Sequence, residues 1–145
     1  MDTLLLDEKL SKFKACFIGT FARDKLPKIK ITIRPSFLIM NTDTSENPGE
    51  HWVAILIGND IGEYFDSFGI TPNYSEIFEF FQINEIKNII YNPYQLQSII
   101  TSTCGAYCVL YIKLRCMGAS FCDFINMFTD DKIQNDLKAY LSVLT

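Results

Sequence analysis

The spacing of apolar residues predicts that the chain begins with a short helix and continues into a sheet. Leu6, Leu10 and Phe13 recur at helical intervals within residues 3–14, behind Thr3 as a possible helix cap. The stretch that follows predicts a loop, marked by Gly19, Pro27 and Pro35. The first strand is expected after this loop.

Two segments are apolar at every position, which is typical of strands covered on both faces. They span residues 37–40 and 52–57, and the turn-rich residues 41–50 predict a surface loop between them. Gly58-Asn59 offers a two-residue hairpin turn, after which residues 63–66 would return antiparallel. The second apolar segment is expected to be the central strand.

The second half of the chain predicts mainly helices. Residues 75–81 have a helical pattern, and residues 86–91 predict one more strand. Residues 104–115 are almost wholly apolar from Ala106 to Ile112, as in a helix buried in the middle of a domain. Thr129 can cap a last amphipathic helix with the apolar residues Ile133, Leu137, Tyr140, Leu141 and Leu144. This order predicts an α+β fold with a small, mostly antiparallel central sheet flanked by helices.

The composition indicates one folded domain, residues 1–145. With 48% hydrophobic and 14% aromatic residues the chain is too apolar for a disordered protein, and no linker rich in Pro, Gly or Ser divides it. Its longest apolar run is far shorter than the roughly 20 residues of a membrane helix. Its first residues lack the basic stretch of a signal peptide. We therefore expect no membrane partner and no secretion.

The formal charge of −4 is unevenly distributed. Residues 1–40 contain eight basic and four acidic residues, whereas the remainder contains five and thirteen. A protein that binds duplex phosphates needs a basic face, and the candidates for one are Arg23, Lys25, Lys28, Lys30 and Arg34. The alternative is a solvated edge strand whose lysines discourage pairing with other chains. We favour the alternative and expect no nucleic-acid partner.

The five cysteines indicate a reducing, intracellular environment rather than a disulfide framework, because their number is odd and no secretory signal is present. Four of them fall within nineteen residues and are the candidates for a zinc site: Cys104, Cys108, Cys116 and Cys122. Structural zinc sites favour short paired knuckles in loops, whereas the residues around these cysteines predict a helix. We therefore expect no metal site, and we interpret all the cysteines except Cys104 as small core residues.

His51 is the one histidine of the sequence and hence the single candidate for imidazole chemistry. If Gly58-Asn59 forms the hairpin turn, His51 faces Asp66 directly. If the turn moves to Asn59-Asp60, the two residues become diagonal neighbours roughly 7–8 Å apart, still within reach of each other. In either register Asp66 can orient the ring and stabilise its protonated form. The alternative role of Asp66 is to initiate the turn that follows it.

Cys104 is the strongest candidate for a nucleophile. Ser102-Thr103 can cap a helix that starts here, which places the thiol in the first turn, where the dipole and the free amides favour a thiolate. Gly105 would leave room for a substrate carbonyl. The oxyanion formed by attack on that carbonyl needs fixed donors. Gln97 could supply its amide beside the Cys104 N–H, and by spacing alone Gln95 is nearly as good.

Five segments, in order, resemble the adenovirus-type endopeptidases, which share a clan of cysteine proteases with the SUMO-specific proteases. They cover about residues 16–112 and read Phe17-Ile18-Gly19-Thr20-Phe21 with Leu26-Pro27, Ile39-Met40-Asn41-Thr42-Asp43, Pro48-Gly49-Glu50-His51-Trp52-Val53-Ala54, Tyr64-Phe65-Asp66-Ser67-Phe68-Gly69, and Gln97 through Cys104-Gly105-Ala106-Tyr107-Cys108. His-Trp, Phe-Asp-Ser-Phe-Gly and Gln-x₆-Cys-Gly in this order are specific. The motifs look most like those of the maturation proteases of virophages and Maverick/Polinton elements.

The resemblance implies the family's fold, with the nucleophile at the N-terminus of a buried helix, and a role for each matched residue. His51 would be the general base, Asp66 its orienting partner, Cys104 the nucleophile and Gln97 the oxyanion donor. Trp52 would pack beside the histidine and line the cleft, and an ordinary core position is an equal alternative for it.

Two departures from the family limit what else the resemblance implies. Adenovirus enzymes have Glu where this chain has Asp66, a change that keeps the charge. Forty-one residues follow Cys104, fewer than in the adenovirus enzymes, and the chain is acidic. We therefore expect activity without the family's activating peptide or DNA cofactor.

The expected function is that of a viral cysteine endopeptidase that processes capsid or scaffold precursors during virion maturation. We expect a monomer that acts in the virion and in the host-cell virus factory. One alternative is a SUMO- or ubiquitin-like deconjugase with the same catalytic set. Another is a non-catalytic binding module of the same fold, against which the complete set of His51, Asp66, Gln97 and Cys104 argues.

Overall fold

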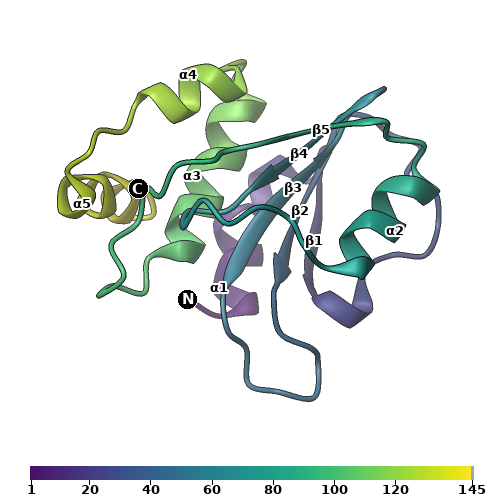
Figure 1. Ribbon diagram of the computed structural model, residues 1–145, viewed down its shortest axis with the longest axis horizontal. Helices are drawn as coiled ribbons and strands as arrows, with labels where there is room; N and C mark the ends of the chain where they lie inside the picture. The colour runs from purple at the N-terminus through teal and green to yellow at the C-terminus, as the bar shows by residue number, and fades with distance from the viewer. Residues whose placement is uncertain (145) are drawn as a thin grey trace.

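The structure is a computed structural model that describes residues 1–144, and its centre is a five-stranded sheet (Figure 1). The strands lie side by side in the order of the chain: β1 (Phe17–Ala22), β2 (Ser36–Asn41), β3 (Trp52–Ile57), β4 (Ile61–Phe65) and β5 (Asn88–Tyr91). The three inner strands are antiparallel, whereas β1 and β5 run parallel to their neighbours. The predicted α+β class is confirmed, but the sheet is mixed rather than mostly antiparallel.

The outer strands are parallel because of the connections that lead to and from them. A parallel neighbour needs a crossover, which residues 23–35 supply between β1 and β2, and which helix α2 (Ser75–Ile83) supplies between β4 and β5. The sequence predicts a loop where β1 lies. Most of its side chains are only partly buried and its register shifts between Phe17 and Gly19, so neither a clean alternation nor an apolar run marks this strand.

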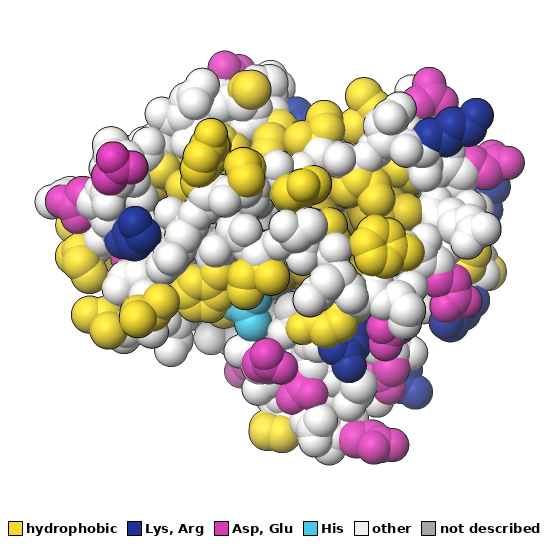
Figure 2. Space-filling view, viewed as in Figure 1, with side chains coloured by type: hydrophobic (Ala, Val, Ile, Leu, Met, Phe, Trp, Pro, Cys, Tyr) yellow, Lys and Arg dark blue, Asp and Glu magenta, His cyan; other side chains and the backbone are white. Residues whose placement is uncertain are grey.

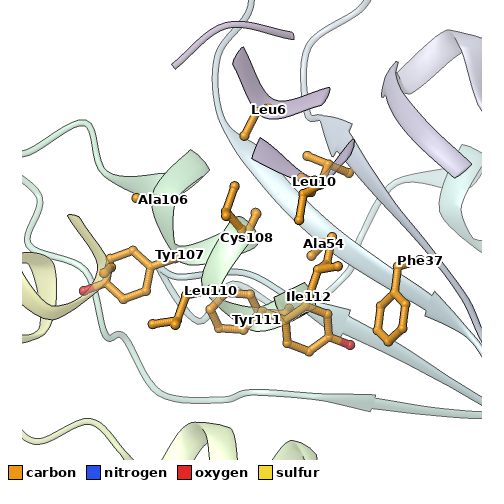
Figure 3. Packing of buried hydrophobic residues seen from close by; sticks show 14 of the residues in the cluster. Leu6, Leu10, Phe37, Ala54, Ala106, Tyr107, Cys108, Leu110, Tyr111 and Ile112 are labelled. Carbon is orange, nitrogen blue, oxygen red and sulfur yellow. The ribbon is translucent and has the colours of Figure 1, made fainter. Parts of the chain in front are cut away.

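Both faces of the sheet are covered, which explains why β2 and β3 are apolar throughout. One face packs against α1 (Thr3–Lys9), α3 (Cys104–Cys116), α4 (Phe121–Asn126) and α5 (Lys132–Ser142), and the other packs against α2. Alternate strand residues divide between the two cores, with Phe37, Ile39, Ala54 and Leu56 on the first face and Leu38, Met40, Val53 and Ile55 on the second. Figure 3 shows Phe37 and Ala54 near the side chains of α1 and α3. As predicted, α3 is buried, from Gly105 to Ile112.

Several helix ends differ from the prediction. The opening helix is capped by Asp2 rather than Thr3 and stops at Lys9, after which a 3-10 turn (Ser11–Phe13) follows. The last helix is capped by Asp131 rather than Thr129. Helix α4 was not predicted, although the reciprocal bonds between Ser120 and Asp123 form a capping box that marks its start.

Helix α5 does not bury the face that its apolar pattern predicts. The five residues expected in the core are 49 to 60% exposed: Ile133, Leu137, Tyr140, Leu141 and Leu144. The buried side of the helix contains Asn135 and Asp136 together with Ala139. The helix is therefore anchored largely by polar side chains, whose hydrogen bonds outweigh the pull of the apolar stripe.

The β3–β4 hairpin turns at Asn59-Asp60, not at Gly58-Asn59. Ala54 lies opposite Phe65 and Ile57 opposite Gly62, and the Gly58 N–H donates to the Ile61 carbonyl at 2.9 Å. A Cβ atom on Gly58 would lie 2.6 Å from that carbonyl oxygen, so the close approach of the two strands requires glycine here. This register selects the diagonal arrangement of His51 and Asp66.

The basic residues of the first third of the chain are mostly paired. Arg23, Lys28 and Lys30 form ion pairs with Glu76, Glu79 and Glu85, at 3.2, 3.5 and 2.5 Å. The Arg34 guanidinium donates to backbone carbonyls of residues 31, 58, 59 and 84. These residues lie in the connection between β1 and β2 rather than on an edge strand, and they tie that connection to α2 and its C-terminal end.

A buried ion pair joins the far end of α3 to the sheet. The Arg115 guanidinium donates to both carboxylate oxygens of Glu63 on β4, at 3.0 and 2.6 Å, and the Tyr111 hydroxyl donates to the same carboxylate. Glu63 is 4% exposed.

Within residues 1–144 no helix is both long enough and apolar enough to cross a bilayer.

Candidate active site

The β3–β4 hairpin brings His51 and Asp66 together. His51 immediately precedes β3 and Asp66 immediately follows β4, so the register places them as diagonal neighbours. The imidazole Nε2 lies 2.7 Å from Asp66 Oδ1. Both side chains are buried, and in Figure 2 the edge of the imidazole reaches the surface beside hydrophobic side chains, above the acidic residues around the β2–β3 loop.

Asp66 serves both of the roles that the sequence leaves open. The oxygen that faces His51 also accepts from the Phe68 N–H at 2.8 Å, and the Asp66 carbonyl accepts from the Gly69 N–H. The carboxylate therefore shapes the turn and orients the ring at once. Gly69 has a φ of +70°, and a Cβ there would lie 2.5 Å from the Tyr94 backbone, so this turn requires glycine.

The backbone of Asp66 is held by Asn92, a residue that the sequence analysis missed. The Asn92 amide donates to the Asp66 carbonyl at 2.6 Å and accepts from the Asp66 N–H at 3.1 Å. Asn92 directly follows β5 and Asp66 directly follows β4. The Asn92 side chain therefore makes the hydrogen bonds to the Asp66 backbone at the point where the pairing of the two strands ends. No periodic pattern or motif in the sequence marks this position.

A stacking contact restricts the imidazole further. The Phe68 ring lies 4.7 Å from the His51 ring, centroid to centroid, at an interplanar angle of 28°. Because Asp66 Oδ1 is bonded to Nε2, Nδ1 is the ring nitrogen that remains for Cys104, whose thiol contributes to the raised pKa of the imidazole.

Cys104 is the first residue of α3, as predicted, but no side chain caps this helix within the described residues. Thr103 is the N-cap residue and contributes its carbonyl, which accepts from the Tyr107 N–H, while its hydroxyl contacts that of Thr101. With no capping side chain to occupy them, the first backbone N–H groups of α3 can stabilise negative charge beside the thiol.

The electrostatics favour a charged His–Cys pair. Burial lowers the pKa of His51, but the hydrogen bonds to Asp66 and Cys104 outweigh it and raise the pKa from 6.5 to about 9. Burial raises the pKa of the Cys104 thiol, but hydrogen bonds from His51 and from the Trp52 backbone bring it below its usual value. Both shifts favour an imidazolium beside a thiolate over two neutral groups.

Gln97 is fixed in the loop before α3. Its amide oxygen accepts from the Ser67 hydroxyl at 2.6 Å, and its nitrogen donates to the Thr101 carbonyl at 3.0 Å. The second N–H of this amide has no acceptor within residues 1–144. Gln95 is exposed and its amide is bound to the Gln97 carbonyl, so the structure favours Gln97 over Gln95 as the donor.

A cleft of about 810 Å³ adjoins the thiol. Its walls are the N-terminal residues, the loop between β2 and β3, and Trp52, with Cys104 at its edge. Trp52 packs partly against the core, and its indole N–H donates to the Met1 carbonyl at 2.9 Å, so it is both a core and a cleft residue. The expected space above Gly105 is occupied, because a Cβ there would lie 3.0 Å from the Met1 Cβ.

The remaining cysteines lie away from this pair. Cys108 is buried in α3, and burial raises the pKa of its thiol. The Cys16 and Cys116 sulfurs are 2.9 Å apart at the other end of α3, and Cys122 is exposed, unlike a core residue. Within the described part of the chain, no three His, Cys, Asp or Glu side chains are grouped so that they could hold a metal ion.

This chain is similar in sequence and in fold to known cysteine proteases. No family model matches the chain. A cysteine protease of African swine fever virus is 27% identical over 114 residues, which are 71% of this chain and 42% of the viral protein. This chain thus spans less than half the length of its curated relative.

Solved structures share the fold. The crystal structure of the African swine fever virus pS273R protease has a TM-score of 0.66 at 18% identity, over 97% of this chain and 66% of that one. ChlaDub1 from Chlamydia trachomatis has a TM-score of 0.53 at 16% identity, over 76% and 57%. The SUMO protease Ulp1 has a TM-score of 0.53 at 15% identity, over 100% and 79%.

These similarities confirm the predicted fold, while the resemblance to virophage and Maverick/Polinton enzymes stays a prediction. The relative is itself a cysteine protease. The chain shares its fold with the African swine fever virus pS273R protease and with the SUMO protease Ulp1.

Proposed function

We propose that this chain is a viral cysteine endopeptidase in which His51, Asp66 and Cys104 form the catalytic triad. The observation that carries the proposal is the buried hydrogen bond between Asp66 and His51, together with the mutual influence of His51 and Cys104 on each other's pKa at the start of α3. The similarity to a viral cysteine protease supports it. A non-catalytic module of the same fold would not need this set of partnered groups.

In the first half-reaction, the Cys104 thiolate attacks the carbonyl carbon of the scissile peptide and forms a C–S bond. The charge that moves to the carbonyl oxygen is stabilised by the Gln97 amide and the Cys104 backbone N–H. The imidazolium of His51 then protonates the leaving amine from Nδ1, the C–N bond breaks, and a thioester remains.

In the second half-reaction, water attacks the thioester carbonyl. His51, now neutral, accepts a proton from this water, the C–S bond breaks, and the thiolate and the imidazolium are restored. Asp66 keeps the ring in place through both steps and stabilises its charge.

The proposed substrate is a capsid or scaffold precursor, cut during virion maturation in the virion and the virus factory. The motifs of maturation proteases support this choice, as does the viral origin of the curated relative. The proposed enzyme works as a monomer. A deconjugase is an equally open alternative, because the SUMO protease Ulp1 has the same fold over the whole of this chain.

Co-expression with the major capsid protein of the same genome tests the proposal. We expect a discrete shortening of the capsid protein with the wild type and none with Cys104→Ala. Asp66→Asn should lower the cleaved fraction and still allow alkylation of Cys104. Cleavage by Cys104→Ala would refute the nucleophile.

A second assay separates the two substrate classes. A SUMO or ubiquitin probe with a C-terminal electrophile should label Cys104 only if the chain is a deconjugase. Labelling without cleavage of the capsid protein would favour the deconjugase.

A further inference from the structure

The polar anchor of α5 leads directly to the loop that carries Gln97. Asp136, 5% exposed, accepts from the Ser98 N–H at 3.3 Å on both carboxylate oxygens and from the Thr101 hydroxyl at 2.7 Å. Its neighbour Asn135 donates to the Leu96 carbonyl at 3.2 Å. One turn of α5 thus binds three residues of the segment 96–101, which lies between the sheet and the nucleophile.

Asp136 also binds the helix that carries the nucleophile. The hydroxyl of Tyr107, three residues after Cys104, donates to Asp136 Oδ1 at 2.7 Å. The same carboxylate therefore joins the 96–101 loop to the first turn of α3 and fixes one relative to the other.

The burial of the Asp136 carboxylate is energetically unfavourable in itself. Within residues 1–144 this carboxylate forms no ion pair with Lys, Arg or His, and its charge is stabilised by neutral donors alone. Burying a carboxylate without a counter-charge is unfavourable unless hydrogen bonds compensate for the lost hydration. Its hydrogen bonds give the loop a defined geometry, which an apolar contact would not.

The loop geometry matters because it sets the oxyanion donor. The Gln97 amide is held at one end by the Ser67 hydroxyl and at the other by the Thr101 carbonyl, and Thr101 is the residue whose hydroxyl binds Asp136. A shift of Thr101 would move the acceptor that aims the Gln97 nitrogen.

We propose that Asp136 is a positioning residue that sets the oxyanion hole by fixing the 96–101 loop, and with it the Gln97 amide, against the first turn of α3. This proposal rests on the proposed function, since it concerns the same site. Asp136 acts through Ser98, Thr101 and Tyr107 and does not touch the reacting atoms.

Two reagents distinguish an effect on the oxyanion hole from an effect on the thiolate. p-Nitrophenyl acetate is attacked at a carbonyl carbon: the Cys104 sulfur forms a C–S bond, an oxyanion develops, and p-nitrophenolate leaves. Iodoacetamide is attacked at a saturated carbon with loss of iodide, so no oxyanion forms. Both rates are read for Cys104 by mass spectrometry, with the Cys104→Ala protein as the background for the other cysteines.

We expect Asp136→Asn to lower the acylation rate at least about tenfold, a part of the roughly 10²- to 10³-fold lost when an oxyanion donor is removed outright. Its alkylation rate should stay within about twofold of wild type, because the contacts of His51, Asp66 and Cys104 with one another are unchanged. Thr101→Val, which removes one hydroxyl donor to Asp136, should act in the same direction. Asp131→Asn is the matched control, because it makes the same acid-to-amide change on the same helix without contact to the loop.

Unchanged acylation in both variants would overturn the proposal, as would an equal fall of acylation and alkylation in variants that remain folded by circular dichroism. If Asp136→Asn does not fold, Thr101→Val decides alone. If the wild type is not acylated above the Cys104→Ala background, the proposed function fails instead.

Discussion

At the scale of single residues, the His51 ring is the point on which the site depends. Its Nε2 hydrogen-bonds to the buried Asp66 carboxylate, and its Nδ1 remains for the Cys104 thiol. Both neighbours raise the pKa of the ring and outweigh the lowering of the pKa by burial. These contacts favour an ion pair in the resting site, and in the proposed mechanism His51 acts first as a proton donor to the leaving group and only afterwards as a base.

The raised pKa of His51 gives the first prediction. Below its pKa of about 9 the ring is protonated, so a titration followed by the single histidine signal in NMR should have its midpoint well above 6.5. Asp66→Asn and Cys104→Ala should each lower the midpoint, because each removes a partner of the charged ring. A wild-type midpoint at or below 6.5 would contradict the ion pair.

The pair between Asn92 and Asp66 gives the second prediction. Asn92→Ala leaves the buried N–H of Asp66 without its partner and removes one of the two donors to its carbonyl, which should cost about 1–3 kcal/mol of unfolding free energy. It should also lower turnover, because Asp66 loses its fixed position. Urea denaturation measures the loss, and Asn88→Ala, a change of an exposed Asn on the same strand, is the control that should have little effect. Equal stability of the two variants would argue against this role.

The site residues differ in how far the sequence could predict them. The pairing of His51 and Asp66 follows from one hairpin, because both of its possible turn registers leave the two side chains within reach of each other. Asn92 and Asp136 could not be predicted in this way, because each acts on a segment far away in the sequence, and the distance between such segments is set by packing rather than by local spacing.

At the scale of elements, α3 is held at both ends by polar bonds. Tyr107 near its start binds Asp136, and Arg115 near its end binds Glu63 on β4. The aromatic contacts of Tyr111 with Phe37 and Phe65 fill the space between these two points (Figure 3 labels Tyr111 and Phe37).

The Glu63–Arg115 pair gives the third prediction. Arg115→Ala leaves the buried Glu63 carboxylate without its counter-charge and should cost about 3–5 kcal/mol of unfolding free energy. Lys113→Ala, on the same helix, should cost much less, because its amine makes a single long bond of 3.4 Å to a carbonyl. Urea denaturation of both variants measures the difference. Similar losses of unfolding free energy in the two variants would contradict a stabilising role of the Glu63–Arg115 ion pair.

Periodicity predicts that an element exists better than it predicts which face is buried. The central strands and the middle of α3 are apolar on all sides, so their burial follows from the sequence without knowing which face is turned to the core. Helix α5 has an apolar stripe and a polar stripe, and the polar one is buried because its partners, the backbone N–H of Ser98 and the carbonyl of Leu96, need hydrogen bonds.

At the scale of the whole molecule, three basic residues from the first third of the chain form ion pairs with acidic residues from its middle. The segment between β1 and β2 supplies the cations and α2, with the turn after it, supplies the anions. The basic excess of the first forty residues is thus partly offset in space by these three carboxylates, which a count of charges along the chain cannot predict.

This pairing gives the fourth prediction. Labelled duplex DNA should show no saturable binding to the protein at moderate salt in a fluorescence anisotropy titration, because three of the five basic candidates are neutralised by carboxylates. The triple variant Glu76→Gln, Glu79→Gln and Glu85→Gln is the control, since it frees these cations and should increase binding. Tight binding by the wild type would contradict the prediction.

The origin of the site in separate segments also bears on when the proposed enzyme would become active. The acid–base pair lies on one hairpin, fifteen residues apart, and can assemble as soon as that hairpin forms. The thiol arrives on a helix more than thirty residues further along the chain, and its pKa falls only when it meets the imidazole. In a chain still emerging from the ribosome this thiol therefore lacks the partners that lower its pKa, and we expect the proposed protease to gain its activity only when residues 51, 66 and 104 have come together.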